Sequence, residues 1–118
     1  MLAGLQRILS FQELKENWND NGAKPFSQKL LQDASKLLLS LSSCPEPEIF
    51  PTATQGIQFE WETKTAYLEI VLYETEITVF AIKNGKDVFD LSLQNTHDYS
   101  GFDLWIFSLW KSINDEHL

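Results

Sequence analysis

The strongest constraint on the fold is a set of short runs between residues 56 and 93 in which apolar and polar side chains alternate. In the run 56–62, Ile57, Phe59 and Trp61 point to one side of an extended chain, and the polar residues between them point to the other. A period of two is typical of strands that bury one face. The sequence therefore predicts an antiparallel sheet in the second half of the chain.

Turn signals divide this region into four expected strands. Thr63-Lys64 and Glu74-Thr75 predict tight turns, and Asn84-Gly85 is the strongest hairpin signal in the chain. A turn at Thr63-Lys64 would set a register in which every apolar residue lies beside another apolar residue. The expected pairs are Trp61 with Ala66, Phe59 with Leu68, and Ile57 with Ile70.

The Asn84-Gly85 turn sets the expected register of the last two strands. The expected pairs, both on the second face of the sheet, are Phe80 with Phe89 and Thr78 with Leu91. The same register puts Asp90 on the first face, where the other side chains are apolar. Either Asp90 marks a sheet edge or the register differs there.

Helical patterns precede and follow the expected sheet. Ser10-Phe11-Gln12-Glu13 fits a capping box that would begin a helix, and Leu2 and Leu5 are compatible with an earlier start. Ser27 predicts the N-cap of a second helix. Its apolar stripe consists of Leu30, Leu31, Ala34, Leu37, Leu38 and Leu41. Pro45, Pro47 and Pro51 predict an extended connection from this helix to the sheet.

A third helix is expected at the end of the chain. Ser100-Gly101-Phe102-Asp103 fits a second capping box, and polar residues follow from Asn114 onwards. The apolar stripe consists of Phe102, Trp105, Ile106, Leu109 and Ile113. Trp110 widens this stripe, and we expect it to be exposed or shared with a partner.

These elements predict an α+β fold in the order α-α-β-β-β-β-α. It would consist of a four-stranded antiparallel meander with two N-terminal helices and one C-terminal helix. The 118 residues suffice for one domain with its own core, so we expect a single domain over residues 1–118.

The charge of the chain restricts its partners. Nine basic and seventeen acidic residues give a net charge of −8 at pH 7, which argues against direct binding of nucleic acid. The same charge favours basic protein surfaces, towards which an acidic protein could also imitate nucleic acid. The sequence lacks a signal peptide pattern and a run of about 18 apolar residues, and Cys44 is its one cysteine. We therefore expect a cytoplasmic protein with no membrane contact.

Few residue patterns point to catalysis. Strand alternation alone accounts for the acidic residues Glu60, Glu62, Glu69, Glu74 and Glu76. The histidines are His97, which is followed by Asp98 and would be half of an acid-base pair, and His117 near the chain end. We expect Cys44 to be a structural residue at the end of a helix. The alternative is that Cys44 is a nucleophile paired with His97. We expect no catalytic residue, no metal and no cofactor.

The second sheet face is more apolar than a water-exposed face should be. Either a helix covers it or another chain does. We expect a protein interface made by Tyr67, Val71, Tyr73, Phe80, Ile82, Phe89 and Leu91, with Glu69 and Glu76 in an acidic rim and Trp110 nearby. Such a surface suits a partner with an apolar centre and a basic edge.

Two segments of the chain resemble a group of small bacterial proteins. These are Asn17-Trp18-Asn19-Asp20-Asn21-Gly22-Ala23-Lys24-Pro25 and, after Ala34 and Pro51-Thr52, Gly56-Ile57-Gln58-Phe59-Glu60-Trp61. The group has Asp-Gly where this chain has Asn19-Asp20, Gly in place of Gln55, and Leu in place of Phe59. The resemblance implies a bacterial or phage origin and a compact α+β domain, and it carries no assigned activity.

The sequence thus predicts a small acidic, non-enzymatic protein-binding module. By analogy, an inhibitor, antitoxin or immunity-type role fits such a domain. A homodimer or larger homo-oligomer with a scaffold role is the first alternative. A small hydrolase or ligand-binding domain that uses Glu60, Glu69 and His97 is the second.

Overall fold

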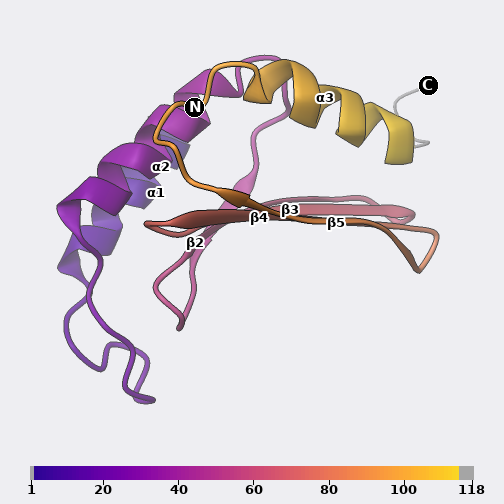
Figure 1. Cartoon of the computed structure of the whole chain (residues 1–118). Coiled ribbons are helices and arrows are strands. Elements are labelled where there is room, and N and C mark those ends of the chain that lie inside the picture. The colour runs from indigo at the N-terminus through magenta and orange to yellow at the C-terminus, as the bar shows by residue number, and fades with distance from the viewer. Residues whose placement is uncertain (1, 115–118) are drawn as a thin grey trace.

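The computed structural model describes residues 2–114, and His117 lies outside them. It is an α+β fold (Figure 1). The sheet is antiparallel and has five strands in the order β1-β2-β3-β4-β5. The elements are α1 (Leu2–Ser10), the 3-10 helix η1 (Phe11–Glu13), α2 (Gln28–Ser40), β1 (Glu48–Pro51), β2 (Ile57–Glu62), β3 (Ala66–Leu72), β4 (Glu76–Lys83), β5 (Lys86–Gln94) and α3 (Phe102–Ile113). Within the described part of the chain, no helix is long and apolar enough to cross a bilayer.

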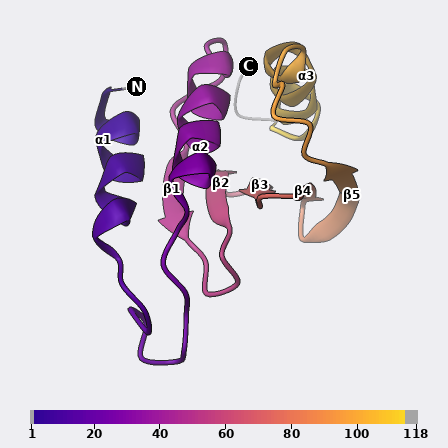
Figure 2. The ribbon, with the colours of Figure 1, turned by 60° about the vertical axis from the view of Figure 1, so that its left-hand side comes forward.

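All three α-helices lie on the same side of the sheet (Figures 1 and 2). Helix α1 packs against α2 and β1, whereas α3 packs over β3 and β4. The sheet therefore has a covered face, which forms the core, and an open face on which none of the described helices packs. The open face carries Glu48, Phe50, Gln58, Glu60, Glu62, Tyr67, Glu69, Val71, Thr78, Phe80, Ile82, Asp90 and Ser92.

Helix α2 forms as its sequence predicts. The side chain of Ser27 accepts a hydrogen bond from the backbone N–H of Leu30, which satisfies one free amide of the first turn. The whole expected apolar stripe is buried, and its members are Leu30, Leu31, Ala34, Leu37, Leu38 and Leu41.

Both predicted capping boxes are wrong. Ser10 ends α1 and directly precedes η1, but its hydroxyl donates to the carbonyl of Arg7 instead of capping an amide of η1. The N-cap of α3 is Gly101, whose φ of 84° is left-handed, and no side chain caps this end. Asp103 instead accepts a hydrogen bond from the backbone N–H of Ser43, because α3 packs close to the end of α2.

The sheet has five strands and not the four we expected. The proline-rich connection contains β1, in which Ile49 pairs with Phe59 and is buried. Pro51 is tolerated because β1 is an edge strand, so the missing N–H removes no bond to a second neighbour. The side chain of Arg7 also donates from Nε to the carbonyl of Ile49 at 3.0 Å, which ties α1 to this edge.

The register between β2 and β3 is displaced by two residues from the predicted one. The pairs are Trp61 with Leu68, Phe59 with Ile70, and Ile57 with Leu72. The connection is longer than a two-residue turn, with the N–H of Thr63 donating to the carbonyl of Ala66 at 2.8 Å. A displacement by two preserves the face of every side chain, so the predicted faces are correct although the pairs are not.

The predicted register of β4 and β5 holds at the turn and then fails. Lys83 pairs with Lys86 as the Asn84-Gly85 turn requires, but an irregularity follows between Ala81 and Ile82. The extra residue on β5 is Val88, and it moves every later side chain of that strand to the other face.

This irregularity moves predicted interface residues to the covered side. Phe89 pairs with Ala81, and its ring meets that of Trp105 edge-on at 6.3 Å between centroids. Leu91 pairs with Val79 and is 36% exposed at the sheet edge. Trp110 is also misassigned, because it is only 6% exposed and belongs to the core between α3 and the sheet.

Candidate functional site

A row of carboxylates crosses the open face. The register places Glu48 beside Glu60, Glu60 beside Glu69, Glu69 beside Phe80, and Phe80 beside Asp90, one residue from each strand. With neighbouring strands about 4.8 Å apart, this row extends over about 19 Å. We call these five residues the acidic row.

The negative charge of the acidic row is not balanced within the described part of the chain. Among the described residues, no Lys, Arg or His forms an ion pair with any of its four carboxylates. Like charges directly opposite each other on neighbouring strands repel, so this arrangement weakens the isolated sheet. It also creates a negative potential over the middle of the open face.

Tyr67 joins two members of the acidic row. Its hydroxyl lies 2.7 Å from Oε1 of Glu69 and 3.0 Å from Oε2 of Glu60. The side-chain amide of Gln58 donates to Glu60 at 2.9 Å and approaches the Tyr67 oxygen at 3.3 Å. A phenol has one proton, so it donates fully to only one carboxylate at a time, and the cluster remains short of donors.

The electrostatics of Tyr67 follow from these contacts. Burial, together with the hydrogen bonds to Glu69 and Glu60, raises the pKa of the phenol far above its usual value of 10.0. Tyr67 therefore remains a neutral donor and adds no charge to the acidic row.

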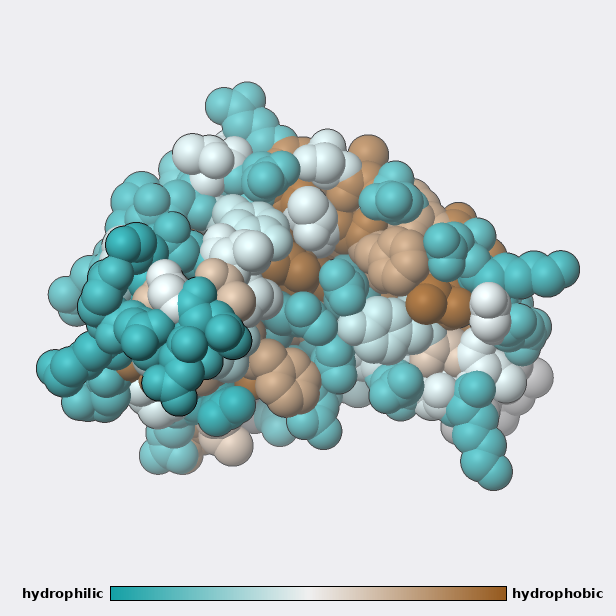
Figure 3. Space-filling model, turned by 90° about the horizontal axis from the view of Figure 1, so that it is seen from below, coloured by the Kyte–Doolittle hydropathy of each residue, from teal (hydrophilic) through white to brown (hydrophobic). Residues whose placement is uncertain are grey.

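The apolar part of the open face is smaller than we expected. Phe80 and Ile82 are half-buried on this face, and Figure 3 shows apolar side chains among polar ones there. Val71 is only 5% exposed, and Gly56 lies against it. The acids Glu60 and Glu69 occupy the middle of the face, so they do not form a rim around an apolar centre.

The structure thus gathers only part of the predicted interface. Tyr67, Glu69, Phe80 and Ile82 lie together on the open face, and Val71 lies on the same face but is buried. Tyr73 and Glu76 flank the β3–β4 turn, where Glu76 accepts a hydrogen bond from Ser92 at 3.0 Å. Phe89, Leu91 and Trp110 lie on the helix side, as described above.

Sequence reasoning missed one member of the acidic row and misplaced another. Glu48 was missed because β1 was read as a connection, and the four residues Glu48–Pro51 give no clear alternating signal. Asp90 was misplaced by the irregularity at Val88, and its polarity on an apolar face was the signal of that error.

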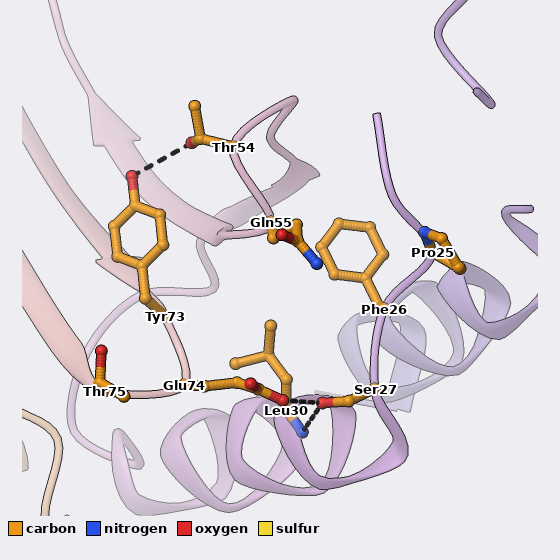
Figure 4. Close-up of a pocket in the computed structure, with 9 residues that line it drawn as sticks. All are labelled: Pro25, Phe26, Ser27, Leu30, Thr54, Gln55, Tyr73, Glu74 and Thr75. Carbon is orange, nitrogen blue, oxygen red and sulfur yellow. Dashed lines mark hydrogen bonds between the residues drawn. The ribbon is translucent and has the colours of Figure 1, made fainter. Parts of the chain in front are cut away.

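A second feature is a cleft of about 500 Å³ at the end of the sheet (Figure 4). It lies where the start of α2, the β1–β2 loop and the β3–β4 turn meet. Its lining consists of Pro25, Phe26, Ser27, Leu30, Thr54, Gln55, Tyr73, Glu74 and Thr75. Tyr73 and Phe26 line opposite sides, and the side chain of Glu74 reaches Ser27 along the floor (Figure 4).

Local turns hold this cleft in shape. The segment 17–25 contains left-handed residues at Asn17, Asp20 and Gly22, as the turn-forming sequence predicts. In the opposite wall, Thr52 and Gly56 are joined by a backbone bond of 2.8 Å and by a bond from the Gly56 N–H to the Thr52 hydroxyl. The turns within 17–25 and 52–56 therefore flank one hollow.

The residues of the alternative hydrolase site are not brought together. His97 lies against α2, where its Nδ1 is 2.7 Å from the buried carboxylate of Asp33, whereas Glu60 and Glu69 lie on the open face. The neighbour Asp98 instead accepts a hydrogen bond from the backbone N–H of Ser100.

Cys44 is also separated from His97. Its thiol faces Asp103 at 3.7 Å, and burial followed by that negative charge raises its pKa to about 12. Over the described part of the chain, no group of three or more His, Cys, Asp or Glu side chains is placed to hold a metal ion.

Comparisons with known proteins give no further guide. No family model matches the chain, and neither the curated proteins nor the solved structures compared with it include a significant match.

Proposed function

We propose that this chain is a non-enzymatic module that binds a basic protein surface with the open face of its sheet. The observation that carries the proposal is the acidic row, with four carboxylates that no described cation neutralises. Lys or Arg side chains of a partner would relieve the repulsion within this row on binding.

Apolar contacts would add to this attraction. Phe80 interrupts the acidic row, and Ile82 and Tyr67 pair beside it on neighbouring strands. Aromatic side chains, Phe among them, are enriched at protein interfaces relative to the rest of the surface. The partner therefore has basic side chains spaced to meet the row and an apolar side chain that meets Phe80.

The charge of the open face separates this proposal from self-association. Two copies packed face to face would bring two acidic rows together, which costs free energy unless cations intervene. A basic partner is thus favoured over a homodimer formed by this face. An inhibitor or immunity-type protein, which blocks a basic surface of its target, is the role that this chemistry suits.

A labelled peptide of alternating lysine and leucine residues tests the proposal. We expect it to bind the full chain in fluorescence anisotropy, more weakly at high salt. The double variant Glu60→Gln/Glu69→Gln should weaken binding at least tenfold. Equal charge removal at two exposed residues outside the sheet, Glu13→Gln/Glu16→Gln, should weaken it much less.

A second pair of variants tests the apolar contact. Phe80→Ala should weaken binding, whereas Leu104→Ala, which truncates an exposed side chain on α3, should leave it unchanged. If Glu60→Gln/Glu69→Gln and the control Glu13→Gln/Glu16→Gln weaken binding of the peptide equally, only net charge attracts it. The proposal would then be wrong.

A further inference from the structure

The cleft at the end of the sheet is large enough to hold a ligand. Its volume of about 500 Å³ lies within the usual range of ligand pockets, about 300–1,000 Å³. It is larger than a single side chain needs, so the neighbouring backbone of a bound segment would also fit.

The aromatic walls of the cleft are fixed without a ligand. The ring of Phe26 packs against the rings of Phe11 and Trp18, each at 6.1 Å between centroids. The indole N–H of Trp18 donates to the carbonyl of Lys24 at 2.9 Å, which holds that ring in place. A site that is already ordered loses little conformational entropy on binding.

Tyr73 forms the opposite wall and is fixed as well. Its hydroxyl lies 3.4 Å from that of Thr54, and a Cβ on Gly56 would stand only 2.8 Å from its ring. The absence of a side chain at Gly56 thus lets the loop pack against Tyr73.

A carboxylate lies between these walls. Oε1 of Glu74 accepts a hydrogen bond from the hydroxyl of Ser27, which in turn accepts one from the N–H of Leu30. No cation among the described residues pairs with Glu74. One carboxylate oxygen therefore anchors the side chain, and the other is left for a donor that enters the cleft.

Aromatic rings beside an unpaired carboxylate are suited to a guanidinium group. Arginine stacks on aromatic faces and donates to carboxylates, and its apolar stem would pass Leu30 and Phe26. An anionic ligand is disfavoured, because Glu74 would repel it and Ser27 already caps α2.

The cleft adjoins the open face. Tyr73 follows Tyr67, Glu69 and Val71 at alternate positions of the chain, so it continues the same side of β3 beyond the strand end. A protein bound to the acidic row would thus reach the cleft with one side chain.

We infer that the cleft is an anchor site for an arginine side chain of the basic partner. This inference rests on the proposed function, because it assigns the cleft to that same partner. The anchor site would make binding depend on an arginine at one position of the partner. The open face by itself selects partners only by charge and apolar contact.

Titration of the full chain with N-acetyl-arginine methylamide, followed by ¹H–¹⁵N correlation spectra, tests the inference. We expect saturable shifts at the amides of Ser27, Gln55 and Thr75, with a dissociation constant of about 1 mM. N-acetyl-citrulline methylamide, which has a similar shape but no charge, should produce no saturable shift there.

Matched variants define the site. Glu74→Gln should weaken arginine binding at least tenfold, and Glu62→Gln, at the far end of β2, should leave it unchanged. Tyr73→Leu should also weaken it, which tests the aromatic wall separately. Equal binding of the citrulline compound, or equal losses in Glu74→Gln and Glu62→Gln, would overturn the inference.

Failure of this inference is distinguishable from failure of the proposed function. If the lysine–leucine peptide binds the acidic row but the arginine compound does not shift the cleft amides, only the anchor site is wrong. The arginine compound could instead bind the cleft while the peptide binds Glu60→Gln/Glu69→Gln as tightly as the unchanged protein. In that case the open face is not the interface, and the cleft is not an anchor site for the same partner.

Discussion

Nδ1 of His97 lies 2.7 Å from Oδ2 of Asp33, although the two residues are 64 positions apart in the chain. Asp33 is 3% exposed within α2, and His97 belongs to the loop before α3, with a left-handed φ of 65°. Lys36 reinforces the junction, because its Nζ donates to the carbonyl of His97 at 2.9 Å. These contacts fasten the start of α3 to α2.

Removal of the imidazole should therefore destabilise the fold. His97→Asn tolerates the positive φ but leaves the buried carboxylate of Asp33 short of a partner, at a cost of about 1–3 kcal/mol. Chemical denaturation followed by circular dichroism measures the loss. The neighbouring exposed substitution Thr96→Ala should cost less than about 0.5 kcal/mol, and equal losses would contradict the structural role of the pair.

Two phenylalanines that the sequence placed together should differ in their effect on stability. Phe89→Ser removes a ring that packs against Trp105 and the core, so we expect a loss of about 2–3 kcal/mol. Phe80→Ser changes the open face and should cost about 1 kcal/mol or less. Urea unfolding measures the free energy of unfolding of both variants. A larger decrease for Phe80→Ser than for Phe89→Ser would refute the register at Val88.

Gly56 should not tolerate a side chain. A Cβ there would lie 2.7 Å from Cγ1 of Val71, 2.8 Å from Cε1 of Tyr73 and 3.0 Å from Oγ1 of Thr52. We expect Gly56→Ala to lower the free energy of unfolding by about 1–3 kcal/mol through overpacking. Thermal unfolding measures this against Ala53→Ser, an exposed change in the same loop, and an unchanged midpoint for Gly56→Ala would contradict the packing.

Cys44 should be an unreactive thiol. Its pKa of about 12 keeps the thiolate scarce near neutral pH, so modification by iodoacetamide should be at least tenfold slower than that of free cysteine. Asp103→Asn removes the negative charge beside the sulfur and should speed the reaction. Mass spectrometry follows both time courses, and rapid alkylation of the unchanged protein would disprove the buried, acid-flanked environment.

Stability should fall on the alkaline side. Burial is the main cause that raises the pKa values of Cys44, Tyr67 and Tyr99 above their usual 9.0 and 10.0. These groups remain protonated in the folded chain while they ionise in the unfolded chain, so their stabilising effect is complete below about pH 9 and diminishes above it.

Urea titrations between pH 8 and pH 11 measure this loss. Tyr67→Phe, which cannot ionise, should show a smaller decrease of the unfolding free energy over that interval than the unchanged protein. Thr96→Ala, a change at an exposed residue without a titratable group, is the control. A stability that is constant up to pH 11 would contradict the burial of these groups.

The sequence by itself determined the local features. The N-cap at Ser27, the turns at Glu74-Thr75 and Asn84-Gly85, and the face of each side chain on β2, β3 and β4 all follow from nearby residues. Periodicity is sufficient for these features because capping, turn formation and alternation depend on a few consecutive residues.

Only the tertiary structure decided the pairings across the fold. Alternation does not change under the two-residue displacement between β2 and β3. The irregularity at Val88 left one sequence signal, Asp90 on an expected apolar face, which did not give its position. The acidic row needs all five strands in register, and the cleft needs Phe26, Gln55 and Tyr73 to meet. Such contacts join residues far apart in the chain, and packing of the whole molecule, more than any single segment, selects them.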